Sequence, residues 1–203
     1  MGAKDRKKLQ RVAEIYKERF KKYFNEYLKK FEEKDDLDSC LDEDLYYWTD
    51  NDGKMNSHQW RVGRGVLEKA HKILKEEVAE LKECESFDEL FKHIDKLAKG
   101  IKGFGKLAVY DTALRIGHTL GLQPEKVYLH RGAKEGARHL GFDGQYIEIS
   151  KSELDSFGLE AKHIEDLLCI FKDCFKLDCE EEFKKCIEGK FCCSAFSIGG
   201  GAC

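Results

Sequence analysis

The sequence predicts a mainly helical, multi-helix globular protein with one long amphipathic helix at its N-terminus. Three features of the 203-residue chain support this fold class. Charged residues make up 37% of it, proline occurs once, and apolar residues recur at steps of three and four within Lys/Glu-rich stretches. That spacing places apolar side chains on one face of a helix, whereas a strand would require alternation. A chain of this length can bury one sizeable core with extensions, or two small ones.

The N-terminal region, residues 1–34, is expected to form the long helix. It carries twelve Lys/Arg against six Asp/Glu. Its apolar face needs a partner surface. Packing on the rest of the chain is the ordinary solution, and a homodimer through this helix is the alternative. The apolar residues at helical spacing are Leu9, Val12, Ala13, Ile15, Tyr16, Phe20, Tyr23, Phe24, Tyr27, Leu28 and Phe31.

Residues 35–56 are expected to form an acidic loop with an aromatic patch, Tyr46-Tyr47-Trp48. Eight Asp/Glu and no Lys/Arg lie between Asp35 and Asp52. Clustered carboxylates invite a calcium site, but the glycine and the terminal glutamate of an EF-hand loop are absent. We therefore expect a solvated acidic surface and no metal site.

Helices are expected to follow from residue 57 onward. Ser57 suits the N-cap of a helix that runs to about Cys84, and Ser86 suits the N-cap of a second helix over Phe87–Lys99. Trp60, near the start of the first of these helices, is typical of a core anchor with arginines as its polar rim.

The most informative stretch joins this second helix to the next one through a turn with two glycines. Gly103 and Gly105 can take backbone angles that are closed to other residues. Leu107–Ile116 then restarts a helix whose first N–H groups point into the turn. With Lys102 and Lys106 on its rims, the turn is expected to cradle an anion.

At these residues the chain resembles the helix-hairpin-helix motif of DNA-binding proteins, in which Gly-hydrophobic-Gly precedes a basic residue and an alanine-containing helix. Here the motif reads Gly103-Phe104-Gly105-Lys106, with Ala108 and Ala113 in the following helix. The resemblance implies binding of a nucleic-acid backbone without sequence preference, with the hairpin N–H groups and the basic side chain on phosphate oxygens. The alternative is an ordinary corner between helices whose glycines serve only turn geometry.

The segment beginning at Asp111 also looks similar to the Asp-Thr-His segment of helix-hairpin-helix DNA glycosylases. In those enzymes a full helix separates the hairpin from the aspartate, whereas Asp111 lies five residues after Lys106, and no histidine follows Thr112. Glycosylase-like chemistry is therefore kept as a minor alternative. In a small helical enzyme of this kind, the acid/base candidates are Asp111, Tyr110 and His130.

A second candidate segment covers residues 123–138. Its apolar run Val127-Tyr128-Leu129 suits either a helix start or an extended stretch. Lys134 and Arg138 lie four apart on one face of an expected helix. Small residues in that helix allow close approach of a backbone or ligand: Gly132, Ala133, Gly136 and Ala137. Tyr110-Asp111-Thr112 combined with Tyr128-Leu129-His130-Arg131 is similar to a recurrent pattern in uncharacterised bacterial proteins, which implies no activity.

The net charge of −3 conceals a segregation of charge along the chain. Residues 99–138 contain eight Lys/Arg and three Asp/Glu, whereas residues 139–203 contain seven lysines and thirteen acids. The hairpin therefore lies in a basic region, as recognition of phosphates requires. The residues expected to bind nucleic acid are Lys102, Gly103, Gly105, Lys106, Arg115, Arg131, Lys134 and Arg138.

Seven of the nine cysteines follow residue 168, but no Cys-x-x-Cys pair supports a zinc ribbon, and no cofactor is expected. Cys169 reads as a small buried hydrophobe. The helical domain is expected to end near residue 189, and residues 190–203 to form a flexible Cys/Gly-rich tail. No apolar run reaches the ~18 residues of a membrane span. The N-terminus lacks the apolar region of a secretory signal, so a cytoplasmic protein is expected.

These features favour a protein that binds the phosphate backbone of DNA or RNA through the hairpin. The first alternative is a small helical enzyme that acts on nucleic acid or a phosphorylated ligand. The second is a helical scaffold whose N-terminal helix and cysteine-rich tail contact other proteins.

Overall fold

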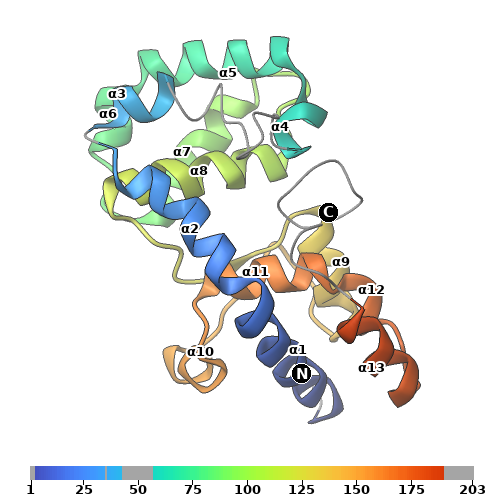
Figure 1. The fold of residues 1–203 in the computed structure, drawn as a ribbon. Coiled ribbons are helices and arrows are strands. Elements are labelled where there is room, and N and C mark those ends of the chain that lie inside the picture. Colours follow the sequence, from blue (N-terminus) through green and yellow to red (C-terminus); the bar gives the residue numbers. More distant parts are fainter. Residues whose placement is uncertain (1–2, 35, 43–56, 190–203) are drawn as a thin grey trace. The chain divides into compact units, whose positions relative to one another are not determined.

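The computed structural model describes residues 3–34, 36–42 and 57–189 (Figure 1). These residues are mainly helical, with 72% helix in 13 helices and 2% strand. The predicted fold class is therefore confirmed. Within the described ranges, no helix combines the length and the apolar character that crossing a bilayer requires. The predicted aromatic patch at Tyr46-Tyr47-Trp48 and the predicted tail at 190–203 lie outside the described residues.

The chain divides into two compact units. Of the described residues, those up to Phe24 and those from Glu125 onward form the terminal unit, and those between Asn25 and Pro124 form the central unit. The N-terminal helical region thus contributes most of its length to a unit that it shares with the C-terminal half of the protein.

The terminal unit packs its helices around one apolar core. Helix α9 lies against α11 and α12, and α1 lies against α10, α11 and α13. The most deeply buried side chains include Tyr16, Phe20, Phe171 and Phe175. Its elements are α1 (Ala3–Arg19), the start of α2 (Lys21–Glu32), β1 (Val127–Tyr128), α9 (Arg131–His139), β2 (Tyr146–Ile147), α10 (Lys151–Phe157), α11 (Ala161–Ile170), α12 (Lys172–Phe175) and α13 (Glu180–Glu188).

Strands β1 and β2 form a two-stranded antiparallel sheet in the terminal unit. Val127 pairs with Ile147 and Tyr128 with Tyr146. The Lys126 Nζ lies 4.3 Å from the ring centre of Tyr146 and 5.4 Å from that of Tyr128. Of the two interpretations left open for the apolar run at 127–129, the extended one is therefore correct.

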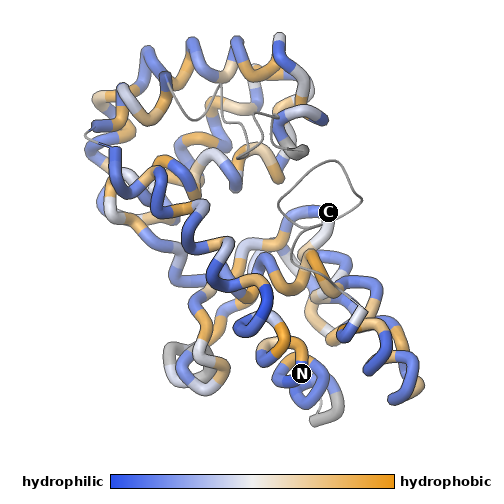
Figure 2. Tube along the Cα trace, in the orientation of Figure 1, coloured by the Kyte–Doolittle hydropathy of each residue, from blue (hydrophilic) through white to orange (hydrophobic). Residues whose placement is uncertain are grey.

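The central unit holds the predicted turn. Helix α7 pairs with α8, while α4 packs on α5 and α8. Hydrophobic and hydrophilic residues alternate along these helices at the spacing of an amphipathic helix (Figure 2). Its elements are the rest of α2, α3 (Leu37–Cys40), α4 (Ser57–Val62), α5 (Arg64–Glu76), α6 (Val78–Lys82), α7 (Phe87–Ala98) and α8 (Lys106–Leu120).

Two of the predicted long helices are interrupted. The N-terminal one is divided at Phe20 into α1 and α2, and its residues contribute to both units. The helix expected from 58 to 84 is divided at Gly63, whose φ of +88° lies in the left-handed region, and again at Glu77. Gly63 has a local cause, because glycine alone adopts that backbone conformation freely. No proline or glycine marks Phe20 or Glu77.

The described part of the acidic segment is a short helix rather than a loop. Asp36 caps α3 by accepting a hydrogen bond from the Ser39 N–H at 2.8 Å. The Lys75 ammonium lies 3.0 Å from a carboxylate oxygen of both Asp38 and Asp42. Leu37 is buried in the same segment. The expected solvated acidic surface is therefore, in this part, an ion-paired contact with α5.

A disulfide between Cys174 and Cys186 joins α12 to α13 in the terminal unit. Cys169 is buried, as expected, but it is also disulfide-bonded rather than a simple hydrophobe. Cys179, between these helices, is an exposed free thiol.

Candidate functional site

The turn between α7 and α8 is built by local sequence signals. Ser86 caps α7 by accepting a hydrogen bond from the Glu89 N–H at 3.2 Å, as predicted. Ile101 and Phe104 are buried and anchor the turn. Gly103 has a φ of +98°, and a Cβ atom there would lie 3.2 Å from the Val66 side chain. A glycine at position 103 is therefore required by the fold.

Gly105, the N-cap of α8, is different. Its φ of −83° and ψ of 178° suit any residue, and a Cβ atom at this position would have no neighbour within 4 Å. The expectation that both glycines need special backbone angles is thus correct only for Gly103. Ser or Asp at this N-cap would satisfy N–H groups of the first helical turn. With glycine there is no side-chain cap, so these N–H groups remain uncovered by the residue that precedes them.

The two lysines of the turn differ in their contacts. Lys102 is exposed. Lys106 is also largely exposed, but its Nζ lies 2.5 Å from Oδ1 of Asp95 in α7. A phosphate that binds Lys106 therefore competes with a carboxylate already in place.

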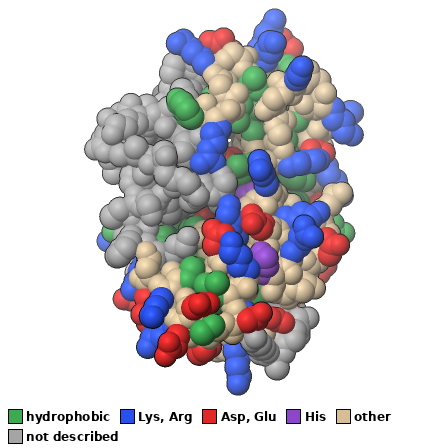
Figure 3. Space-filling view, turned by 90° about the vertical axis from the view of Figure 1, so that its right-hand side faces the viewer, with side chains coloured by type: hydrophobic (Ala, Val, Ile, Leu, Met, Phe, Trp, Pro, Cys, Tyr) green, Lys and Arg blue, Asp and Glu red, His purple; other side chains and the backbone are tan. Residues whose placement is uncertain are grey.

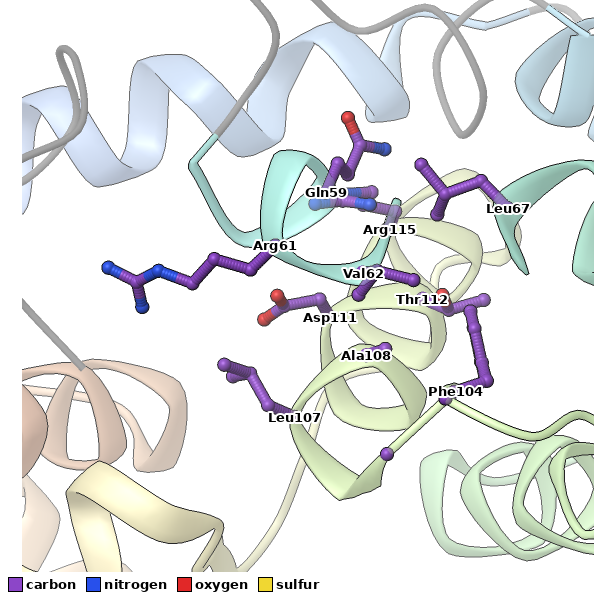
Figure 4. Close-up of a pocket in the computed structure, with 12 residues that line it drawn as sticks. Gln59, Arg61, Val62, Leu67, Phe104, Leu107, Ala108, Asp111, Thr112 and Arg115 are labelled. Atoms are coloured by element: carbon purple, nitrogen blue, oxygen red, sulfur yellow. The ribbon is translucent and has the colours of Figure 1, made fainter. Parts of the chain in front are cut away.

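A pocket of about 190 Å³ opens beside the turn, entirely within the central unit (Figure 4). Its walls come from α4, the start of α5, the turn and α8 as far as Arg115. The apolar lining residues are Val62, Leu67, Phe104, Leu107 and Ala108. The polar lining side chains are Gln59, Arg61, Asp111, Thr112 and Arg115.

Arg115 brings a buried positive charge to this pocket. The residue is only 3% exposed. Its Nε donates to the Tyr27 hydroxyl at 2.6 Å, and its guanidinium carbon lies 5.9 Å from the ring centre of Phe31. Burial acts to lower the pKa of Arg115, but electrostatic interactions with Tyr27 and Asp111 outweigh it, and the net shift is upward. The side chain therefore stays cationic.

Two residues of α4 lie on the exposed side of the site. Arg61 is exposed, and its side chain extends outward from the other lining residues (Figure 4). Trp60 is 73% exposed. The interpretation of Trp60 as a core anchor is therefore wrong, because α4 is a single short element that turns this side chain outward rather than the start of a long buried helix.

The three acid/base candidates occupy different environments. Asp111 is half-buried and lines the pocket. Tyr110, the neighbouring residue on α8, is buried with its ring edge-on to Phe87 at 6.2 Å and does not line the pocket. His130 lies in the terminal unit, where its buried Nε2 contacts Oε1 of Glu165. Of the three, only Asp111 belongs to the pocket.

The remaining predicted nucleic-acid-binding residues lie on α9 in the terminal unit. Arg131 and Arg138 are exposed, and Lys134 is half-buried. On the face drawn in Figure 3, Lys and Arg are interleaved with Asp and Glu, and hydrophobic side chains form only small separate groups.

Gln59 and Thr112 were missed by sequence reasoning, although both are 97% buried and line the pocket. A signal for Thr112 was present, because Ala108, Thr112 and Arg115 follow helical spacing on α8. No local signal links Gln59 to α8. Among the described residues, no group of three or more His, Cys, Asp or Glu is arranged to hold a metal ion.

Comparison of the chain with protein-family models, curated proteins and solved structures finds no match.

Proposed function

We propose that the protein binds the phosphate backbone of nucleic acid through the turn Gly103–Lys106. The observation that carries this proposal is Gly105. The fold does not require a glycine there, and a capping side chain would favour the helix by about 1 kcal/mol. A bare N-cap is useful where a ligand must approach the backbone closely.

The surroundings of the turn support a phosphate ligand. Helix α8 has 15 residues, and the positive end of its dipole lies at the turn. Lys102 and Lys106 flank the two glycines, and Arg61 stands at the adjoining pocket. Uncovered backbone N–H groups with nearby cations are the usual means of holding phosphate oxygens. The resemblance of Gly103-Phe104-Gly105-Lys106 to the helix-hairpin-helix motif points the same way.

The variant Gly105→Asp tests this proposal. Aspartate is a good N-cap, so the helix should be at least as stable as before, whereas its charge should repel a phosphate from the turn. We expect duplex DNA to bind about tenfold more weakly or worse, by fluorescence anisotropy.

Ser86→Asp is the matched control. It adds the same charge at the N-cap of α7, and that helix of 12 residues spans about 18 Å. This exceeds the screening length of ~8–10 Å at physiological salt, so affinity should be retained. Unchanged DNA affinity in folded Gly105→Asp would refute the proposed role of the turn.

The pocket favours a second candidate, an enzyme that acts on nucleic acid or a phosphorylated ligand. Asp111 is a half-buried carboxylate at this pocket, which is where an acid or base would have to lie. If Asp111 performs such a role, Asp111→Asn should abolish turnover, and the variant should still bind nucleic acid or the phosphorylated ligand. A scaffold without phosphate affinity would fail both the binding and the turnover assays.

A further inference from the structure

The pocket beside the turn contains a buried cation, and no carboxylate of residues 3–34, 36–42 or 57–189 neutralises it by direct contact. Within the described part of the chain, the Arg115 guanidinium contacts a neutral hydroxyl, on Tyr27, and a ring face, on Phe31. The nearest acid along α8 is Asp111, which acts on Arg115 through its charge and not through an ion pair. Most of the donors on this guanidinium are therefore left for another acceptor.

A cation in this position is costly to the folded protein. Removing a charged group from water is compensated only when the charge is paired and hydrogen-bonded. The aromatic and hydroxyl contacts of Arg115 supply part of that compensation. Because the side chain also lines the pocket, an anion bound there would supply the rest.

The pocket holds several groups that suit one small anion. Arg115 provides the buried charge, Arg61 provides a second charge on the exposed side, and Gly105 brings the start of α8 to the rim. Gln59 and Thr112 add an amide and a hydroxyl to the same lining. A set of guanidinium, backbone N–H and hydroxyl groups can donate to several oxygens of one phosphate. It therefore recognises a phosphate more specifically than an anion with a single acceptor atom.

We infer that this pocket binds a terminal phosphate monoester, with Arg115 as its buried counter-charge. The volume of about 190 Å³ is below the ~300–1,000 Å³ of pockets that enclose whole drug-sized ligands, so it fits a phosphate and part of its sugar. The ligand is either the phosphorylated end of a nucleic-acid strand or a free sugar phosphate. The strand-end source rests on the proposed function, because the turn would hold the neighbouring backbone.

Two measurements separate these sources. Fluorescence anisotropy compares a short, internally labelled blunt duplex with phosphorylated 5′ ends to the same duplex with hydroxyl ends. Calorimetric titration compares ribose 5-phosphate with ribose. We expect the phosphorylated duplex to bind about tenfold tighter, as one or two charge-assisted hydrogen bonds would provide, and ribose 5-phosphate to bind while ribose does not.

Arg115→Gln should abolish the preference for the phosphorylated duplex and the preference for ribose 5-phosphate over ribose. Arg115→Lys should retain part of both preferences. Lys72→Gln, at an exposed position of α5 outside the pocket lining, is the matched control, because it removes one positive charge from the central unit and should leave both preferences unchanged. If Arg115→Gln fails to fold by circular dichroism, the exposed Arg61→Ala still tests the pocket, and the end preference should fall severalfold.

The outcomes for the pocket and for the turn are distinct. Binding of ribose 5-phosphate without an end preference supports the pocket and assigns it a free sugar phosphate. Absence of both ribose 5-phosphate binding and an end preference overturns the inference, even if the duplex still binds through the turn. Binding of ribose 5-phosphate by a protein that binds no duplex supports the pocket and rejects the proposed function.

Discussion

Gly136 in α9 lies directly against the backbone of Leu168 in α11, so closely that a Cβ atom on Gly136 would overlap the Leu168 carbonyl oxygen. The small residues of α9 therefore serve helix packing, which is one of the two roles considered for them. Gly136 and its neighbour Ala137 are both buried.

Gly136→Ala should destabilise the terminal unit by about 1–3 kcal/mol, because the obstacle is backbone and cannot rotate away. Gly65→Ala is the contrasting variant, since Gly65 lies in α5 with no atom within 4 Å of an added Cβ. That change should raise stability by up to about 1 kcal/mol. Urea denaturation followed by circular dichroism measures both, and equal stability of the two variants would contradict the packing argument.

Replacing both turn lysines, Lys102→Ala with Lys106→Ala, should weaken binding to duplex DNA of any sequence. The slope of log affinity against log salt should fall by about one to two units, because each lost phosphate contact releases about one counterion fewer. The double variant Lys29→Ala with Lys30→Ala on α2 is the control, because it removes the same number of positive charges away from the turn. Anisotropy at several salt concentrations measures the slopes, and the same slope in both double variants would argue against the turn.

Asp111→Asn should strengthen binding of ribose 5-phosphate severalfold. The Asp111 carboxylate lines the same pocket as Arg115, so it repels an incoming phosphate and partly offsets the arginine charge. Calorimetric titration compares the variant with the unmodified protein. Weaker binding in Asp111→Asn would place the carboxylate in direct contact with the ligand, as a hydrogen-bond acceptor, and contradict the electrostatic argument.

Asp42 should make stability depend on pH at the contact between the acidic segment and α5. The hydrogen bond from Lys75 lowers the pKa of Asp42 below its ordinary 3.8; burial opposes this, and a hydrogen bond from His71 adds to it. A carboxyl with a lowered folded pKa contributes stability above its unfolded pKa, and this contribution is lost as the pH falls through the folded value.

Asp42→Asn should therefore be less stable than the unmodified protein near neutral pH. The difference should shrink once the pH falls below 3.8. Urea denaturation at a series of pH values measures this, with the exposed Glu83→Gln as the control that should follow the unmodified protein. If the stability difference between Asp42→Asn and the unmodified protein stayed constant across the acid range, the ion pairs of Asp42 would not be the source of that difference.

The parts of the structure that could be predicted are those with local causes. The Ser86 cap, helix α7 and the turn at Gly103 each follow from residues within a few positions of one another. The interruptions at Phe20 and Glu77 carry no proline or glycine, and tertiary packing can override helical spacing at such points.

The pocket was less predictable than the turn. Asp111 and Arg115 share a helix and could be related by spacing, but Gln59 and Arg61 come from α4, about fifty residues earlier in the chain. Periodicity reports which face of a helix is apolar and not which other helix will meet it. The division into two units, in which α1 shares a unit with α9–α13, also has no signature in composition.

The burial of Arg115 separates two kinds of attraction within one site. Salt screens the charges of the exposed turn lysines strongly, whereas it screens the charge of a guanidinium that is 3% exposed much less. Rising ionic strength should thus release the strand backbone before it releases a phosphate from the pocket. At high salt the protein would therefore bind only the phosphorylated ends of nucleic-acid strands.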